Sequence, residues 1–474
     1  MARGIQSSFA SPLPDSMRRP LATVALFAIS AGLAWSAHAA GWPREQMLIA
    51  GILAATVLLW MTEALPLFAT AFVSIASQLL LLGNPGGWSE LGFEGGGGPA
   101  PEDFLNAAAD PVLLLFFGGL VLARAVATSR LDARIAALVL RPMSATPSRL
   151  LLGVILTTSF FSLLMSNTAT TALMLALIAP ALVQIPASES FRKALLLAVP
   201  ISANIAGMST PIASPPNAIA VSYLAREGAA LGFQRWMIIA IPGVVVLLLL
   251  TWWRLLRLFP PSGRPWRIEF PEARLTPRGV VVFVVAVVTF ACWVTEPWHG
   301  VPAAMVAALP VTALFAAGII TRDDVNTLDW DVLILIAGGL TLGYSLQATG
   351  LDGRLATLVP AGSGDLARVL VLAAATIGLG TFFSNTAIAS MLMPVAILAA
   401  GFGSGRVDVT SYALTVALVA SLSMALPVST PPNAMAYARG GLTTGDFMRT
   451  AGFIGLVGAV LVSLMLVFVR PWLG

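Results

Sequence analysis

The chain has 474 residues, of which 58% are hydrophobic and only 10% are charged, and its mean hydropathy is +0.89. Soluble domains carry about 25% charged residues, so this composition indicates an integral membrane protein. Two histidines and one cysteine exclude a disulfide framework and a Cys/His zinc site, and the sole lysine follows an arginine, which excludes an ATP-binding P-loop. The net charge of +4 is explained by arginines at cytoplasmic helix ends, so we expect the lipid bilayer and not nucleic acid as a partner.

Apolar segments long enough to cross or enter a membrane follow one another along the chain. Two of them, 149–187 and 366–402, are nearly twice as long as one span and contain the polar sequence SNT at their middle, which favours re-entrant helical hairpins. The others give about 11 transmembrane helices in an all-α polytopic membrane protein. These lie at about 20–40, 46–62, 65–83, 107–128, 194–224, 236–258, 279–297, 301–320, 331–350, 410–438 and 450–470.

The distribution of basic residues orients these segments. With the N-terminus in the cytoplasm, nearly three quarters of the 26 Lys and Arg residues fall on the inner side, as the positive-inside rule requires. We therefore expect a multi-pass protein of the inner (cytoplasmic) cell membrane with a cytoplasmic N-terminus. Residues 17–40 also resemble a secretory signal, and its removal would leave the remaining topology unchanged.

The sequence repeats itself in five landmarks that keep the same order. Each half contains five crossings and one hairpin. Because five is an odd number, the second half must enter the membrane from the opposite face, which makes the halves an inverted repeat. The predicted domains are an N-terminal segment with the first helix (1–45), repeat 1 (46–258), a basic cytoplasmic linker (259–278) and repeat 2 (279–474). The paired landmarks are WMTEALP at 60–66 with WVTEPWH at 293–299, FFGGLVL at 116–122 with IAGGLTL at 336–342, RLDAR at 130–134 with GLDGR at 350–354, SNTAT at 166–170 with SNTAI at 384–388, and SPPNAIA at 214–220 with TPPNAMA at 430–436.

The two SNT sequences, 166–168 and 384–386, would lie at the hairpin tips. A single SNT is explained well by helix capping, but two copies at matched tips favour an ion site. Carbonyls that end the first half-helix suit a cation, and amides that begin the second suit an anion. Ser162 lies one turn before the first tip and can add a hydroxyl, whereas its counterpart, Gly380, cannot. The two sites are therefore not expected to be equivalent.

The sequences Ser-Pro-Pro-Asn at 214–217 and Thr-Pro-Pro-Asn at 430–433 each lie inside a long crossing. Consecutive prolines remove two amide donors and break the helix. A kink for packing is one explanation. The duplication beside two hairpin tips favours a midplane transport site. The glycine pairs 118–119 and 338–339 predict close helix packing.

Paired SNT tips followed by paired [ST]-P-P-N breaks resemble the divalent anion:sodium symporter family of dicarboxylate, citrate and sulfate carriers. The resemblance covers residues 46–470. It implies an elevator-type secondary transporter, usually a homodimer, in which a domain of hairpins and broken helices carries a dianion and Na⁺ past a fixed scaffold.

The resemblance also implies site residues. Substrate carboxylates would contact Asn167, Thr168, Ser214, Asn385, Thr386, Thr430 and Pro431. One Na⁺ would lie near Ser162, Ser166, Asn167 and the Ala213 carbonyl, and a second near Gly380, Phe383, Asn385 and the Ser429 carbonyl. The resemblance implies a threonine at position 380, where this chain has glycine.

The function expected from the sequence is Na⁺-coupled symport of C4-dicarboxylates such as succinate, malate or fumarate. An anion exchanger or a sulfate or oxyanion carrier of the same fold remains an alternative. An intramembrane enzyme is not expected, because neither histidine lies near the SNT or PPN motifs. A channel would not need broken helices in both halves.

Overall fold

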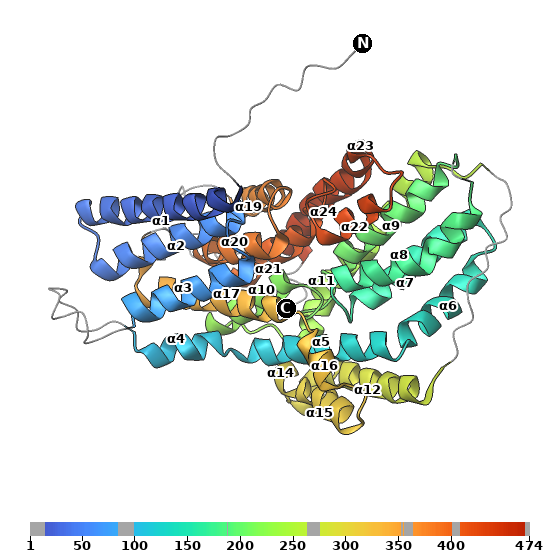
Figure 1. Cartoon of the computed structure of the whole chain (residues 1–474), viewed down its shortest axis with the longest axis horizontal. Helices are drawn as coiled ribbons and strands as arrows, with labels where there is room; N and C mark the ends of the chain where they lie inside the picture. Colours follow the sequence, from blue (N-terminus) through green and yellow to red (C-terminus); the bar gives the residue numbers. More distant parts are fainter. Residues whose placement is uncertain are drawn as a thin grey trace, which may run out of the picture.

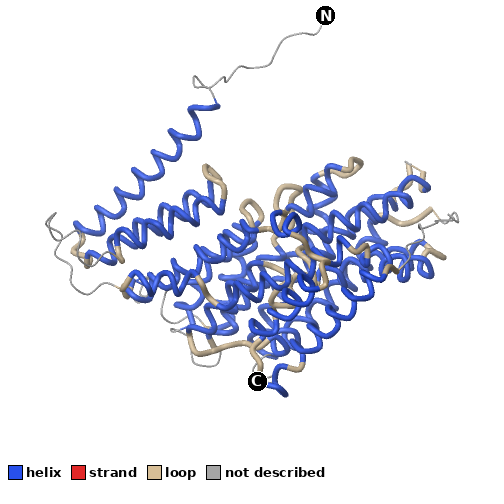
Figure 2. Tube along the Cα trace, turned by 60° about the horizontal axis from the view of Figure 1, so that its bottom comes forward, coloured by secondary structure: helices blue, strands red, loops and turns tan. Residues whose placement is uncertain are grey.

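The computed structural model describes residues 15–83, 99–186, 188–262, 275–351, 354, 364–400 and 408–469. Within these ranges all regular structure is helical (Figure 2). Seven helices there are long and apolar enough to cross a membrane, and further apolar helices of 10–17 residues accompany them. The expected fold class, an all-α polytopic membrane protein, is confirmed. The basic linker falls largely outside the described residues.

The first elements of the chain form a row of neighbouring helices. Helix α1 packs against α2, α2 against α3, and α3 against α17 of the second half. Figure 1 shows α4, α5 and α6 following one another along one side of the molecule. The bounds are α1 (Asp15–Ala39), α2 (Arg44–Thr62), α3 (Leu67–Leu81), α4 (Pro101–Ala108), α5 (Pro111–Thr128), α6 (Leu131–Met143) and α17 (Trp330–Ala348).

Each SNT sequence lies at a break between two paired helices, as the sequence predicts. Helices α7 (Pro147–Ser162) and α8 (Asn167–Gln184) pack together around the first break, and α19 (Asp365–Gly380) and α20 (Asn385–Ala400) around the second. Each break ends at the serine of SNT, because its hydroxyl accepts a hydrogen bond from a backbone amide in the first turn of the next helix. Both hairpins therefore exist as helical pairs.

Each PPN motif begins the second half of a broken helix. Helices α9 (Phe191–Ala206) and α10 (Pro215–Arg226) are separated by residues 207–214, and α21 (Val409–Leu422) and α22 (Pro431–Ala438) by residues 423–430. Proline occupies the first turn of α10 and α22, where its missing amide costs no helical hydrogen bond. The prolines therefore start new helices after the breaks.

The two halves of the chain interlock through glycines. A Cβ atom on Gly118 of α5 would lie 2.6 Å from the carbonyl oxygen of Ala307, and one on Gly338 of α17 would lie 2.5 Å from Cβ of Ala71. Only glycine permits helices to approach this closely, so the close packing predicted for both glycine pairs is confirmed at these two positions.

The remaining helices complete a core that runs through both halves. The second part of each broken helix packs on one hairpin helix and on the broken helix of the other half: α10 contacts α20 and α21, and α22 contacts α8 and α9. The other helices are α11 (Phe233–Leu258), α12 (Pro277–Val294), α13 (Glu296–His299), α14 (Ala303–Val306), α15 (Ala308–Ala316), α16 (Arg322–Asn326), α23 (Thr444–Phe447) and α24 (Phe453–Leu464), with π-helical turns at Met448–Gly452 and Met465–Val469.

The predicted orientation of the chain determines which loops a membrane-impermeant thiol reagent reaches. With Cys292 replaced by serine, Ala230→Cys should be labelled on intact cells, because the exposed loop after α10 lies outside if α7 and α8 together return the chain to the cytoplasmic side. Ala145→Cys, in the exposed turn between α6 and α7, should be labelled only after permeabilisation. Labelling of neither variant on intact cells would mean that α7 and α8 together make a single crossing, and labelling of Ala145→Cys alone would mean that the predicted orientation is reversed.

Candidate functional site

Four helix N-termini meet at one cavity with a volume of about 520 Å³. They belong to α8 and α20, which follow the hairpin tips, and to α10 and α22, which follow the broken-helix loops. The first residues of α3 and α17 complete the wall. The lining comprises Pro66, Leu67, Phe68, Ser166, Asn167, Thr168, Asn204, Ala213, Ser214, Pro215, Pro216, Asp329, Asp331, Val332, Leu335, Ser384, Asn385, Thr386, Thr430, Pro431 and Pro432. Every residue that the family resemblance assigns to the substrate lies in this lining.

The hairpin tips present amides and side chains to the cavity. The hydroxyl of Ser166 accepts from the Ala169 amide at 3.3 Å, and that of Ser384 accepts from the Ala387 amide at 3.2 Å. Capping is therefore one role of both serines. The first amides of a helix have no partner within the helix, so each tip retains donors, which the helix dipole makes attractive to an anion.

The asparagine of each PPN motif holds its broken-helix loop. Asn217 Nδ2 donates to the carbonyl oxygens of Gly207 and Thr210, both at 2.8 Å. Asn433 Nδ2 donates to those of Met424 at 2.8 Å and Leu426 at 2.9 Å. A loop without helical hydrogen bonds needs other partners for its buried carbonyls. These asparagines, which the sequence analysis did not assign to the site, satisfy two carbonyls in each loop.

Asn204 is a cavity residue that the sequence analysis missed. Its Nδ2 atom lies 3.2 Å from Thr430 Oγ1 and 3.4 Å from Asn433 Oδ1, so it links α9 to the broken helix of the other half. Its Oδ1 atom is buried and has no hydrogen-bond partner among the described residues. An asparagine in the largely apolar stretch 194–206 was the available signal, since such residues are rarely tolerated without a role.

The first predicted Na⁺ group contains oxygens that converge. Ser162 Oγ lies 2.8 Å from Asn167 Oδ1 and 2.9 Å from the Ala203 carbonyl oxygen. Its single proton can be donated to only one of them. Thr210 Oγ1 donates to the Leu163 carbonyl at 3.1 Å and ties the loop to the hairpin. Hydroxyl, carboxamide and carbonyl oxygens are ligands suited to a hard cation, so the residues here fit Na⁺.

The second predicted Na⁺ group is arranged differently. Asn385 Oδ1 is buried without a hydrogen-bond partner in the described part of the chain, whereas its counterpart on Asn167 has Ser162. Ser429 Oγ donates to the Thr381 carbonyl at 2.6 Å, so here too the loop is tied to the hairpin. Ser162, Gly380, Phe383 and Ser429 lie outside the cavity lining, while Ser166, Asn167, Ala213 and Asn385 belong to it.

The cavity carries acidic but not basic side chains. Among the described lining residues none is a lysine, arginine or histidine, and two are aspartates, Asp329 and Asp331. Partial burial and, next, the charge of Asp331 raise the pKa of the Asp329 carboxyl. Among the described lining residues, an anion can therefore be attracted by helix N-termini, hydroxyl groups and asparagine amides, and in addition by bound cations.

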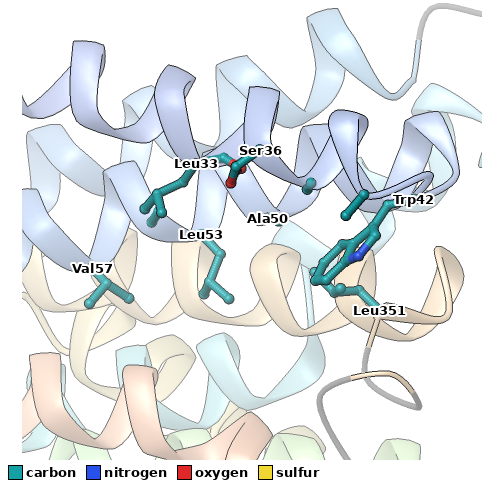
Figure 3. A pocket seen from close by; sticks show the side chains of 10 residues that line it. Leu33, Ser36, Trp42, Ala50, Leu53, Val57 and Leu351 are labelled. Atoms are coloured by element: carbon teal, nitrogen blue, oxygen red, sulfur yellow. Dashed lines mark hydrogen bonds between the residues drawn. The ribbon is translucent and has the colours of Figure 1, made fainter.

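A second cleft of similar volume, about 510 Å³, is of another kind (Figure 3). It lies between α1 and α2, and its lining is almost wholly aliphatic, with Ser36 and Trp42 as the residues that carry polar side-chain atoms. Polar groups do not converge there, so the cleft cannot orient a dianion.

The sequence matches the family described as citrate transporter (CitMHS) over residues 57–419. The chain belongs to this family. The membership agrees with the resemblance to dicarboxylate, citrate and sulfate carriers, and it identifies the protein as a membrane transporter and not an enzyme.

Individual relatives extend the match along most of the chain. A Haemophilus influenzae protein named "uncharacterized transporter" is 30% identical over 439 residues, which cover 87% of this chain and 90% of the relative. A Staphylococcus aureus protein named sodium-dependent dicarboxylate transporter SdcS is 27% identical over 452 residues, with 87% of this chain and 84% of the relative covered. An "uncharacterized transporter" of Schizosaccharomyces pombe is 26% identical over 434 residues, which cover 89% of this chain but 49% of the relative.

Proposed function

We propose that this citrate-family transporter is a Na⁺-coupled symporter of small dicarboxylates, with C4 acids such as succinate, malate and fumarate as its substrates. The observation that carries the proposal is the meeting of four helix N-termini at a cavity whose described lining has no basic side chain. Each helix N-terminus contributes about half a positive charge, spread over its first turn.

The charges of the substrate explain the need for Na⁺. A dicarboxylate brings two negative charges into a cavity that already contains Asp329 and Asp331. The helix N-termini supply only partial positive charge against the two substrate carboxylates. A cation beside each hairpin tip would supply the remaining positive charge. The clustered oxygens around Ser162 offer one such place. The name of the Staphylococcus aureus relative, a sodium-dependent dicarboxylate transporter, supports this coupling.

We further propose that transport follows an elevator mechanism. The mobile domain would comprise the hairpins and broken helices, α7 to α11 and α19 to α24, and α2 to α5 with α12 to α17 would form the scaffold. Polar contacts between these groups concentrate on α10: Ser222 Oγ donates to Asp110 Oδ2 at 2.6 Å, and Arg226 Nη1 donates to the Leu340 carbonyl at 2.7 Å. Such contacts are few enough to be exchanged when one domain slides against the other.

The location of the cavity suggests which state this is. Its wall includes the beginnings of α3 and α17, and the arginine distribution assigns both of these helix ends to the cytoplasmic side. We therefore infer an inward-open arrangement in the cytoplasmic membrane.

Experiment must distinguish Na⁺-coupled dicarboxylate symport from two alternative functions, a dicarboxylate exchanger and a carrier for sulfate or another oxyanion. Purified protein in proteoliposomes should accumulate labelled succinate when a Na⁺ gradient is imposed, and not when choline replaces Na⁺ outside. Unlabelled malate and fumarate should compete, and sulfate should not. Uptake that requires internal dicarboxylate instead of Na⁺ would establish the exchanger, and competition by sulfate alone would establish the oxyanion carrier.

A further inference from the structure

Each predicted Na⁺ group has two equivalent positions, one at the end of a hairpin helix and one after the first part of a broken helix. One of the two carries a serine and the other a glycine, and the order is reversed between the halves. In the first half, the last residue of α7 is Ser162 and the residue that follows α9 is Gly207. In the second half, the last residue of α19 is Gly380 and the residue that follows α21 is Ser423. Ser162 and Gly380 each lie four residues before the serine of SNT. Gly207 and Ser423 each lie seven residues before the serine or threonine that precedes the two prolines of PPN. The positions therefore correspond between the halves.

In the first half, glycine at position 207 leaves room for the hairpin tip. A Cβ atom on Gly207 would collide with the carboxamide of Asn167. The hydroxyl that contacts this carboxamide comes instead from Ser162, at 2.8 Å from Asn167 Oδ1. Position 207 therefore points toward the tip asparagine but supplies no side chain.

In the second half, the side chain comes from the loop and the empty position lies on the hairpin. A Cβ atom on Gly380 would lie 2.5 Å from Ser423 Oγ and 2.6 Å from Ser423 Cβ. Ser423 is fully buried and fills the space that a residue at position 380 would occupy. Serine therefore fits at position 423 because position 380 has no side chain.

We propose that Ser423 supplies the hydroxyl ligand of the second Na⁺ site, in place of the hydroxyl that Gly380 lacks. This assignment rests on the proposed Na⁺ symport. The other ligands would be the carboxamide oxygen of Asn385 and carbonyl oxygens at the hairpin tip.

The hydrogen bonds around Ser423 are compatible with this role. Its hydroxyl lies 3.3 Å from the carbonyl oxygens of both Thr376 and Val419, so its proton has an acceptor and its lone pairs remain for a cation. The buried Asn385 Oδ1 has no partner among the described residues and needs one. Gly207, the counterpart of Ser423, faces the carboxamide of Asn167, so the same correspondence directs Ser423 toward Asn385, and one Na⁺ bound by both oxygens would give each a partner.

The experiment measures Na⁺ binding without substrate. Purified full-length protein is titrated with Na⁺ at constant ionic strength with choline, and the thermal unfolding midpoint is followed, because a bound cation stabilises the folded state. Ser423→Ala should raise the Na⁺ concentration for half of the stabilisation on the order of tenfold, since a ligand to a charge is lost. Thr415→Val, which removes another buried hydroxyl of α21 that donates to the Ser411 carbonyl at 2.8 Å, is the matched control and should bind Na⁺ like the wild type.

A double substitution guards against a variant that is merely misfolded. Gly380→Ser alone should unfold at lower temperature because of its collision with Ser423. Gly380→Ser combined with Ser423→Gly reproduces the arrangement of Ser162 and Gly207, and should restore Na⁺ binding to within about threefold of the wild type.

The outcomes are distinguishable. If the wild type responds to Na⁺ and Ser423→Ala responds equally, the assignment of Ser423 is wrong and the symport proposal stands. If the double variant binds Na⁺ as weakly as Ser423→Ala, the exchange of the hydroxyl between positions is also refuted. If the wild type shows no stabilisation by Na⁺ and no Na⁺-dependent succinate uptake, the proposed function fails and this site fails with it.

Discussion

Replacing Na⁺ with choline at fixed ionic strength should lower the affinity of the purified transporter for succinate by roughly 5- to 150-fold, a coupling free energy of about 1–3 kcal/mol. The reason is the charge of the cavity. Its described lining contains two aspartates and no basic residue, so positive charge beyond the helix dipoles has to come from cations. Because coupling is reciprocal, succinate must raise the affinity for Na⁺ by the same factor. Equilibrium binding of labelled succinate at several Na⁺ concentrations measures both quantities.

A pair of serine variants makes this prediction specific to the first cation group. Ser162→Ala removes a hydroxyl 2.8 Å from Asn167 Oδ1, and should raise the Na⁺ requirement while leaving succinate affinity at saturating Na⁺ nearly unchanged. Ser159→Ala is the control, since that hydroxyl donates to the Ile155 carbonyl of its own helix at 2.8 Å. Succinate affinity that does not depend on Na⁺ would leave the exchanger as the explanation, with a counter-anion driving the return step.

The sequence was sufficient for the breaks in the helices, because the residues that cause them act locally. A serine caps the helix that follows it, and paired prolines begin a helix but cannot continue one, so SNT and PPN mark helix starts wherever they occur. The duplication then placed both motifs at equivalent points of the two halves. The same reasoning holds for Gly118 and Gly338, where the lack of a side chain predicts close packing without naming the partner.

The contacts that unite these local features could not be predicted. Asn204 reaches Thr430 across more than two hundred residues of sequence, and nothing near position 204 indicates that partner. The pairing of Gly380 with Ser423 likewise depends on how a hairpin packs against a broken helix. From the sequence, glycine at position 380 reads as a missing ligand. The structure places the hydroxyl of Ser423 in the space that a side chain at position 380 would occupy. The hydroxyl is therefore supplied from a different position of the chain.

The asparagine of PPN gives a further prediction with a large effect. Asn433→Asp keeps the shape of the side chain but removes both donors to the carbonyls of Met424 and Leu426. An ionised aspartate would face two carbonyl oxygens in a fully buried position, so it must take up a proton. Keeping a carboxyl of ordinary pKa protonated at pH 7 costs about 4 kcal/mol. Even then it can donate to only one of the two carbonyls, and the other stays unpaired at a cost of about 1–3 kcal/mol.

We therefore expect Asn433→Asp to unfold at a markedly lower temperature than the wild type at pH 7 and to transport no succinate. The sign of the pH dependence is fixed by the protonation that the folded state demands: the deficit in thermal stability should shrink as the pH falls from 7 to 5, because the folded state then binds its extra proton more cheaply. Asn217→Asp should behave alike, since Asn217 holds Gly207 and Thr210 in the same way. Asn326→Asp, which adds the same charge at an exposed position on α16, should leave stability and transport unchanged at both pH values. A stable and active Asn433→Asp protein at pH 7 would mean that the loop does not depend on this asparagine, and that the break after α21 is maintained by the prolines and the packing of α22 against α8 and α9 alone.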